Sequence, residues 1–417
     1  MKLQDSDFSI ENIRDFTEYF QKLFENVDPT FLDGIAAIIR HAKEKLENVE
    51  IKEIIPTAKE RKLTENETIE MIEDFYSYLS PELGEIVHNS GRLVNYTIES
   101  EDITESNHEN IHLNGQYESV LIGIHEHAHR LTLGEINDRE KIDNVSSLSR
   151  SYFSEMDAIF SEMLGADYLR KTYGFDGDLT SMRFEQLKKI DDYMKDRDGV
   201  KSFVNVIEAM SRYLKFIRSI PLANSTKQQY IDELKALETA VCPDYANGKK
   251  RPGNLFSISK GDLNSGDYSK LSLIKDGFLI KHNFGFLLAN YMHEFADLNN
   301  LQQAREIFEK MVKVSSMSKG LEPEQMKLLV EMGLPFMVTD GCLAMDQSGV
   351  EKINDAFDRT LDRYKSKERS SPTAKSKEVV IEKITYVIKN PPPIENINVA
   401  RKCLTEKEKI NKDESIK

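Results

Sequence analysis

Three histidines and a glutamate lie within five residues of each other in the segment VLIGIHEHAHRLTL, residues 120–133. His125, Glu126 and His129 form the pattern H-E-x-x-H, and on a helix positions i and i+4 lie one turn apart on the same face. Two imidazoles placed in this way can both bind one Zn²⁺ ion, at about 2.0–2.1 Å from each nitrogen. The glutamate between them lies close enough to accept a proton from a water that the metal activates. The segment therefore predicts a catalytic zinc site.

The surroundings of the motif favour this interpretation. The apolar residues VLIGI at 120–124 predict that the helix is buried. Burying two histidines and a glutamate without partners costs several kcal/mol, and metal coordination removes that cost for the imidazoles. His127 lies two residues after His125 and must point elsewhere, so we expect it to be hydrogen-bonded to a neighbouring group.

A catalytic zinc site needs a third protein ligand and an open coordination position. The next long predicted helix, residues 151–174, contains Glu155, Asp157 and Glu162. Glu155 and Glu162 are two turns apart and share a face, whereas Asp157 lies about 160° around the helix from Glu155. Glu155 is the candidate ligand, and a solvated surface carboxylate is the alternative. Glu162 is then placed to accept a hydrogen bond from the outer nitrogen of a ligand histidine, and Asp157 is expected at the surface.

Apolar residues at helical spacing predict a mainly helical chain. The exception is the segment before the histidine cluster, residues 92–117, where short β-branched and aromatic runs alternate with Asn and Ser and predict two or three short strands. The predicted helical segments are 8–48, 67–79, 81–91, 118–173 with a break near 140–146, 183–243, 277–316, 322–332 and 347–364.

Composition limits the class of protein. The chain has 417 residues, of which 39% are hydrophobic and 30% charged, and this balance is typical of a globular protein with a sizeable core. The net charge of −15 argues against a nucleic-acid partner, because such surfaces need an excess of Lys and Arg. No apolar run is long enough to span a membrane. The N-terminus has no apolar signal segment, and the three cysteines are far apart, so a reduced, cytoplasmic setting without cysteine metal ligands is expected.

The second helix carries a longer match to a known family. Residues 155–169, EMDAIFSEMLGADYL, resemble the stretch E-V-A-S-T-F-N-E-M-L-x-x-D-Y-L found in the thimet oligopeptidase and oligoendopeptidase F group of zinc metallopeptidases. In that family the glutamate that is the third zinc ligand follows H-E-x-G-H at an interval like the 26 residues from His129 to Glu155. The resemblance implies that His125, His129 and Glu155 hold one zinc ion.

The resemblance extends over residues 55–364 and is strongest at 111–169. It implies a mainly α fold, an elongated multi-helix metallopeptidase catalytic domain with a small β-sheet beside the active-site cleft. Residues 1–54 then form an N-terminal helical segment, shorter than the corresponding part of the family. Residues 365–417 form a polar, net-basic tail with one possible strand at 378–389. We expect a solvated tail, and docking on a partner or on the acidic body is the alternative.

Some positions depart from the family pattern. Ala128 replaces the glycine of H-E-x-G-H, and Ala158 replaces a serine. The family has a tyrosine-rich run whose hydroxyls are thought to stabilise the oxyanion, and here the corresponding positions are Phe278, Ile280 and His282. His282 is a candidate replacement, since an imidazole N–H can donate like a phenol; a purely structural histidine is the alternative.

Together these features predict a zinc-dependent endopeptidase for short peptides, with Glu126 as the general base. An extended peptide could pair with the strand expected at 111–117. One alternative is a zinc-binding relative that is catalytically weak or inactive and acts as a binding or regulatory module, because the family tyrosines are replaced. Another is a metal-free helical scaffold.

Overall fold

The histidine cluster lies within the part of the chain that the structure describes. The computed structural model describes residues 8–51, 62–91, 95–98, 110–113, 115, 117–135, 153, 155–174, 180–198, 203–241, 277–296, 300–316 and 321–370. The chain divides into two units, Met1–Arg363 and Tyr364–Lys417, and the cluster lies in the first. The strand predicted at 378–389 lies outside the described residues, and the domain boundaries predicted after residues 54 and 364 stay predictions.

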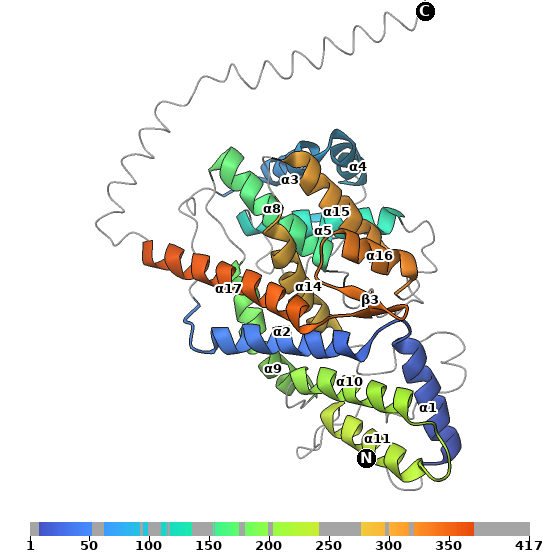
Figure 1. Cartoon of the computed structure of the whole chain (residues 1–417). Helices are drawn as coiled ribbons and strands as arrows, with labels where there is room; N and C mark the ends of the chain where they lie inside the picture. Colours follow the sequence, from blue (N-terminus) through green and yellow to red (C-terminus); the bar gives the residue numbers. More distant parts are fainter. Residues whose placement is uncertain are drawn as a thin grey trace, which may run out of the picture. The chain divides into compact units, whose positions relative to one another are not determined.

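The described part is mainly helical, as the sequence predicted (Figure 1). The helices are α1 (Ile10–Leu23), α2 (Pro29–Glu47), α3 (Glu65–Leu79), α4 (Pro81–Gly91), α5 (Tyr117–Glu135), α8 (Met156–Tyr173), α9 (Thr180–Asp198), α10 (Phe203–Ser219), α11 (Lys227–Val241), α14 (Gly277–His293), α15 (Leu301–Ser316), α16 (Pro323–Glu331) and α17 (Gln347–Ser370). None of them combines the length and the apolar character that crossing a membrane requires.

The helical segment predicted at 8–48 consists of two helices, and local chemistry explains the break. Asn26 has a positive φ of 62°, a conformation that ends a helix. Pro29 then begins α2 at a position where its missing N–H costs nothing. The Asp28 side chain accepts a hydrogen bond from the backbone N–H of Thr30 at 2.9 Å and caps the new helix.

Helix α8 is the centre of the arrangement that positions the cluster. It packs against α5 and α14, and also contacts α3 and α15. Its side chains are buried nearly all round, which is typical of a helix without a solvent face. The expectation that Asp157 is at the surface is therefore wrong, since its side chain is fully buried. The prediction from helical geometry assumed that one face of this helix is exposed to solvent, but α8 is surrounded by neighbouring helices.

Two glycines let other helices approach the site closely. A Cβ atom at Gly165 of α8 would lie 2.7 Å from Cδ1 of Ile124 in α5. A Cβ atom at Gly285 of α14 would lie 2.9 Å from Cβ and 3.1 Å from the carbonyl carbon of Glu155. The distances of 2.7 and 2.9 Å are shorter than real Cβ contacts, so these helix pairs depend on the absence of a side chain at both glycines.

The first small sheet lies beside α5. It pairs β1 (Asn95–Ile98) with β2 (Asn110–Leu113) in parallel, and β2 contacts α5. The structure confirms short strands before the cluster. The strand predicted at 111–117 is shorter, however, because α5 already begins at Tyr117.

A second sheet was not predicted. The strands β3 (Met337–Thr339) and β4 (Cys342–Ala344) form an antiparallel hairpin. Asp340 and Gly341 connect them with φ values of 51° and 75°. Positive φ at both turn positions is the geometry that an Asp-Gly pair favours in two-residue hairpins, so this dipeptide was the available signal.

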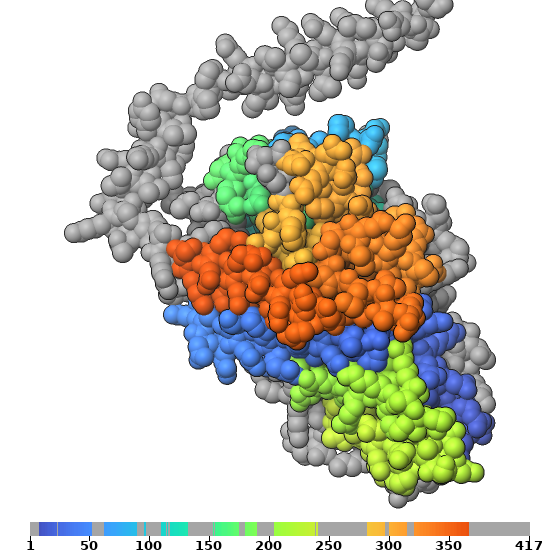
Figure 2. All heavy atoms as spheres, viewed as in Figure 1, coloured from blue at the N-terminus to red at the C-terminus, as the bar shows by residue number. Residues whose placement is uncertain are grey.

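The hairpin contacts the N-terminal helices. The backbone N–H of Asp28 donates to the carbonyl oxygen of Leu343, and the backbone N–H of Leu343 donates to the carbonyl oxygen of Asn26, both at 2.8 Å. In the view of Figure 2, the orange atoms of the C-terminal part of this unit border the blue atoms of its N-terminal helices, and β4 contacts α2. The first unit is therefore held together in part by hydrogen bonds between segments that are far apart in the sequence.

We predict that Gly285→Ala destabilises the protein by about 1–3 kcal/mol, because the added methyl group overlaps the backbone at Glu155. Denaturant unfolding measures this. The matched control is Gly34→Ala in α2, where the new atom approaches the flexible thioether of Met345 at 2.8 Å, and where replacing a helical glycine gains about 0.5–1 kcal/mol. Equal effects of the two substitutions would contradict the close approach of α14.

Candidate metal centre

Helix α5 presents the two histidines of the motif to α8. His125 and His129 are one turn apart on the face that packs against α8, and their rings have centroids 4.6 Å apart. The helix is buried here, as predicted, because the residues that precede the motif belong to the core. Val120, Leu121 and Ile124 are fully buried. The apolar stretch thus anchors the helix and holds the imidazoles in place.

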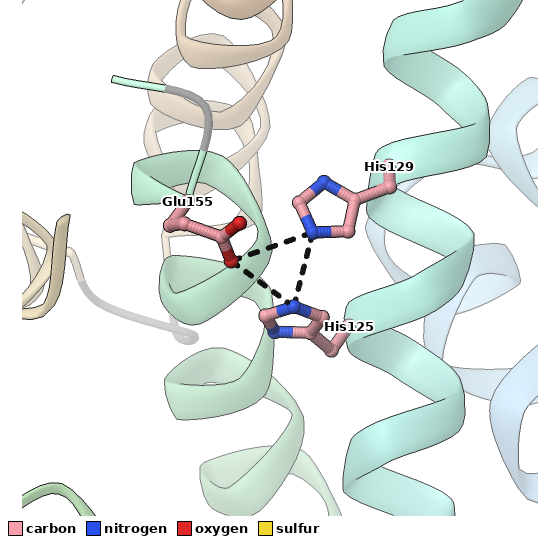
Figure 3. Close-up of side chains that lie close together, drawn as sticks. All are labelled: His125, His129 and Glu155. Atoms are coloured by element: carbon pink, nitrogen blue, oxygen red, sulfur yellow. Dashed lines mark hydrogen bonds and ion pairs between the residues drawn. The ribbon is translucent and has the colours of Figure 1, made fainter. Parts of the chain in front are cut away.

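Glu155 completes a compact group of three ligands (Figure 3). It lies at the N-terminal end of α8, as the residue that immediately precedes Met156. Its Oε2 atom is 3.4 Å from Nε2 of His125 and 3.5 Å from Nε2 of His129, and the two Nε2 atoms are 3.0 Å apart. The structure thus brings together the three residues that the sequence singled out as ligands.

These separations fit one small metal ion. At ligand distances of about 2.0–2.2 Å, tetrahedral ligands lie about 3.3–3.6 Å from each other, close to the three observed distances. All three ligand atoms lie within 4.8 Å of one another. Two neutral imidazole nitrogens and a carboxylate oxygen are also a donor set that suits divalent transition metals. The group can therefore hold a metal ion.

The outer nitrogen of His125 faces a second carboxylate. Its Nδ1 atom is 2.5 Å from Oε1 of Glu162, an ion-pair distance. Glu162 is two turns after Glu155 on the same helix, so one face of α8 contacts both nitrogens of one ring. The same Glu162 oxygen accepts a hydrogen bond from Nη2 of Arg183 on α9 at 2.6 Å. Sequence reasoning predicted the place of Glu162 and missed Arg183.

Buried charges shift the pKa values of this chain of groups. Burial alone would lower the pKa of His125, but the carboxylates of Glu162 and Glu155 outweigh burial and raise it to about 10. Burial would raise the pKa of Glu162, but the charge of Arg183 and the contact with His125 lower it below its usual value. When no metal ion is bound, both shifts favour the charged forms, with His125 protonated and Glu162 ionised.

Glu126 lies beside the ligands without being one of them. Its side chain is buried, at 8% exposure. Burial raises its pKa, the positive charges of His125 and His129 oppose the rise, and the carboxylates of Glu155 and Glu162 add to it. A carboxylate with a raised pKa is better matched to proton transfer near neutral pH than a solvated one.

His127 and His282 have different surroundings. Nε2 of His127 makes a hydrogen bond with the hydroxyl group of Tyr96 on β1 at 3.1 Å, which confirms the predicted neighbour contact. Burial, with a contribution from Arg130, lowers the pKa of His127 to about 4. His282, on α14, places Nδ1 at 3.2 Å from the same Glu155 oxygen that faces the ligand histidines. It lies next to the metal ligands but outside their group of three.

We predict that the protein binds one Zn²⁺ ion per chain and that Glu155→Ala weakens binding by more than the roughly 10–100-fold loss typical for a partner outside the ligand set. Competition with a chromophoric chelator measures the affinity. The control is His127→Gln, on the same helix but directed at Tyr96, which should bind zinc like the native chain. Wild-type affinity in the Glu155 variant would exclude this residue as a ligand.

We also predict that zinc binding releases a proton. The raised pKa of His125 means that its Nε2 position carries a proton at pH 7, which the metal must displace. Affinity should therefore rise by about tenfold per pH unit for each released proton, up to the pKa of His125. Calorimetric titrations in two buffers with different protonation enthalpies count the protons. A heat that is the same in both buffers would contradict a protonated His125.

Comparisons with known proteins give no match for this chain. No protein-family model matches it, and no curated protein and no solved structure matches it either. The interpretation of the site therefore rests on its own residues and their geometry.

Proposed function

We propose that the chain is a zinc-dependent peptidase related to the thimet oligopeptidase and oligoendopeptidase F group. The observation that carries the proposal is the meeting of an H-E-x-x-H helix with a carboxylate from a second helix. His125, His129 and Glu155 supply three ligand atoms within 4.8 Å of one another, and Glu126 lies between the two histidines in sequence. Three protein ligands with one open position are the pattern of catalytic zinc sites.

The exposure of the side chains indicates where the open position lies. The Glu155 side chain is 2% exposed and that of His125 is 8% exposed, whereas His129 reaches 22% and His282 reaches 19%. Solvent therefore reaches the group from the side of His129 and His282. A water molecule or a substrate would enter from that side.

The proposed mechanism divides the work among these residues. A zinc ion bound at this site supplies Lewis acidity, which polarises a peptide carbonyl and makes a water molecule more acidic. Glu126 accepts the proton of the attacking water and delivers it to the leaving nitrogen. Glu155 and the two histidines keep the donor set fixed. His282, on the open side, is the proposed N–H donor to the carbonyl oxygen.

Short peptides are the proposed substrates. Strand β2 pairs with β1 on one edge, and among the described strands nothing pairs with its other edge. An extended peptide can bind such an edge through backbone hydrogen bonds, which tolerates many sequences. β2 contacts α5, the helix that carries the histidines.

A second candidate function has its own support in the sequence. Phe278 and Ile280 occupy positions where the family has tyrosines, so hydroxyl donors to the oxyanion are missing there. A chain that binds zinc but stabilises the oxyanion poorly would act as a binding or regulatory module. Zinc binding without peptide turnover would favour this alternative over the peptidase.

We predict that the zinc-loaded protein cleaves internally quenched fluorescent peptides, that a chelator abolishes cleavage, and that Glu126→Gln lowers turnover by about 10²–10⁴-fold because the proton acceptor is lost. The variant should still bind one zinc ion. Glu118→Gln, in the first turn of the same helix, is the control and should cleave at the native rate. Cleavage that resists the chelator, or that persists in Glu126→Gln, would exclude this mechanism.

A further inference from the structure

A buried arginine lies next to the proposed metal centre, and the sequence pattern gave no sign of it. Arg183 is near the start of α9, and its side chain is 6% exposed. An unpaired buried charge costs several kcal/mol. The carboxylate that pairs with Arg183 therefore indicates the role of this arginine. Within the described part of the chain, the one carboxylate that pairs with Arg183 is Glu162, at 2.6 Å.

The contact joins three helices through a single oxygen atom. Oε1 of Glu162 on α8 is 2.6 Å from Nη2 of Arg183 on α9 and 2.5 Å from Nδ1 of His125 on α5. A carboxylate held from two sides cannot rotate away from either partner without breaking a charged contact. The guanidinium is also steadied by Gln186 one turn later, whose Oε1 accepts a hydrogen bond from Nη1 at 3.3 Å.

We propose that Arg183 is a positioning residue for the metal centre, which holds Glu162 Oε1 against Nδ1 of His125 and so keeps Nε2 of that ring directed at the metal. The orientation of a ligand imidazole is commonly set by the group that its outer nitrogen contacts. Here that group is itself set by a third residue. The inference rests on the metal centre of the proposed function, but it does not require peptide cleavage.

The test measures metal affinity in a double-mutant cycle on the full chain. The variants are Arg183→Met, Glu162→Gln and their combination, each titrated with Zn²⁺ against a chromophoric chelator. Arg183→Met should lose about 10–100-fold in affinity, the range for a partner outside the ligand set. In the Glu162→Gln background the same substitution should change affinity by no more than about twofold, because its effect acts through Glu162.

A spectroscopic measurement separates positioning from general destabilisation. Co²⁺ bound to the native chain should give the visible absorption of a tetrahedral ion. Arg183→Met should alter that spectrum, and Arg183→Lys, which keeps a positive charge near Glu162, should restore part of it. Arg170→Met is the control: Arg170 lies in the last turn of α8, at the other end of that helix from Glu155, and pairs with Asp167 at 2.7 Å, so affinity and spectrum should stay native.

The outcomes distinguish this inference from the proposed function. Native zinc affinity in Arg183→Met, or equal losses in both backgrounds of the cycle, would overturn the role of Arg183. If Arg183→Met does not fold, Arg183→Lys and Gln186→Leu decide: a loss of affinity in either, absent in the Glu162→Gln background, supports the inference, and native affinity in both overturns it. A native chain that binds zinc but cleaves no peptide refutes only the peptidase.

Discussion

The carboxylate of Glu155 must stay within about 3.5 Å of two imidazoles that belong to a different helix, and much of the fold serves that constraint. A helix pair tolerates little displacement before such a contact is lost, because ligand geometry is set to tenths of an ångström. The structure provides close packing on both sides of α8: Gly165 admits Ile124 of α5, and Gly285 admits the backbone at Glu155. The two glycines therefore allow α5 and α14 to pack closely against α8, which fixes the distance between these helices.

Electrostatics makes the same site costly without a ligand. Three carboxylates, three imidazoles and a guanidinium gather where water is largely excluded, and each ion removed from water carries a desolvation penalty. The penalty is offset by pairing: Glu162 is shared between His125 and Arg183, and Glu155 faces His125, His129 and His282. The carboxylates of Glu162 and Glu155 raise the pKa of His125 and so favour its protonated, positively charged ring in the absence of a metal. A divalent ion would displace that proton and satisfy the same carboxylates.

The arrangement bears differently on the candidate functions. A metal-free scaffold leaves the close approach of two Nε2 atoms and one carboxylate without a purpose, although a shared proton can bridge them. A metal-binding module explains the ligands but gives no role to Glu126, a buried carboxylate with a raised pKa beside them. A hydrolytic function would use both the metal ligands and Glu126. In the proposed mechanism, the replaced tyrosine positions leave His282 as the donor to the oxyanion; its side chain is 19% exposed and lies 3.2 Å from Glu155.

The sequence by itself determined the metal-ligand pattern, because H-E-x-x-H requires only one helix and its periodicity is local. The match around Glu155 and the two-turn spacing to Glu162 extended this to a second helix, and the short strands before α5 were likewise predictable from composition. Tertiary structure alone decided the rest. Asp157 is buried because four helices enclose α8, which no wheel drawn on one helix reveals. Arg183 joins the site from α9, since long-range pairing depends on how helices pack and not on spacing along the chain.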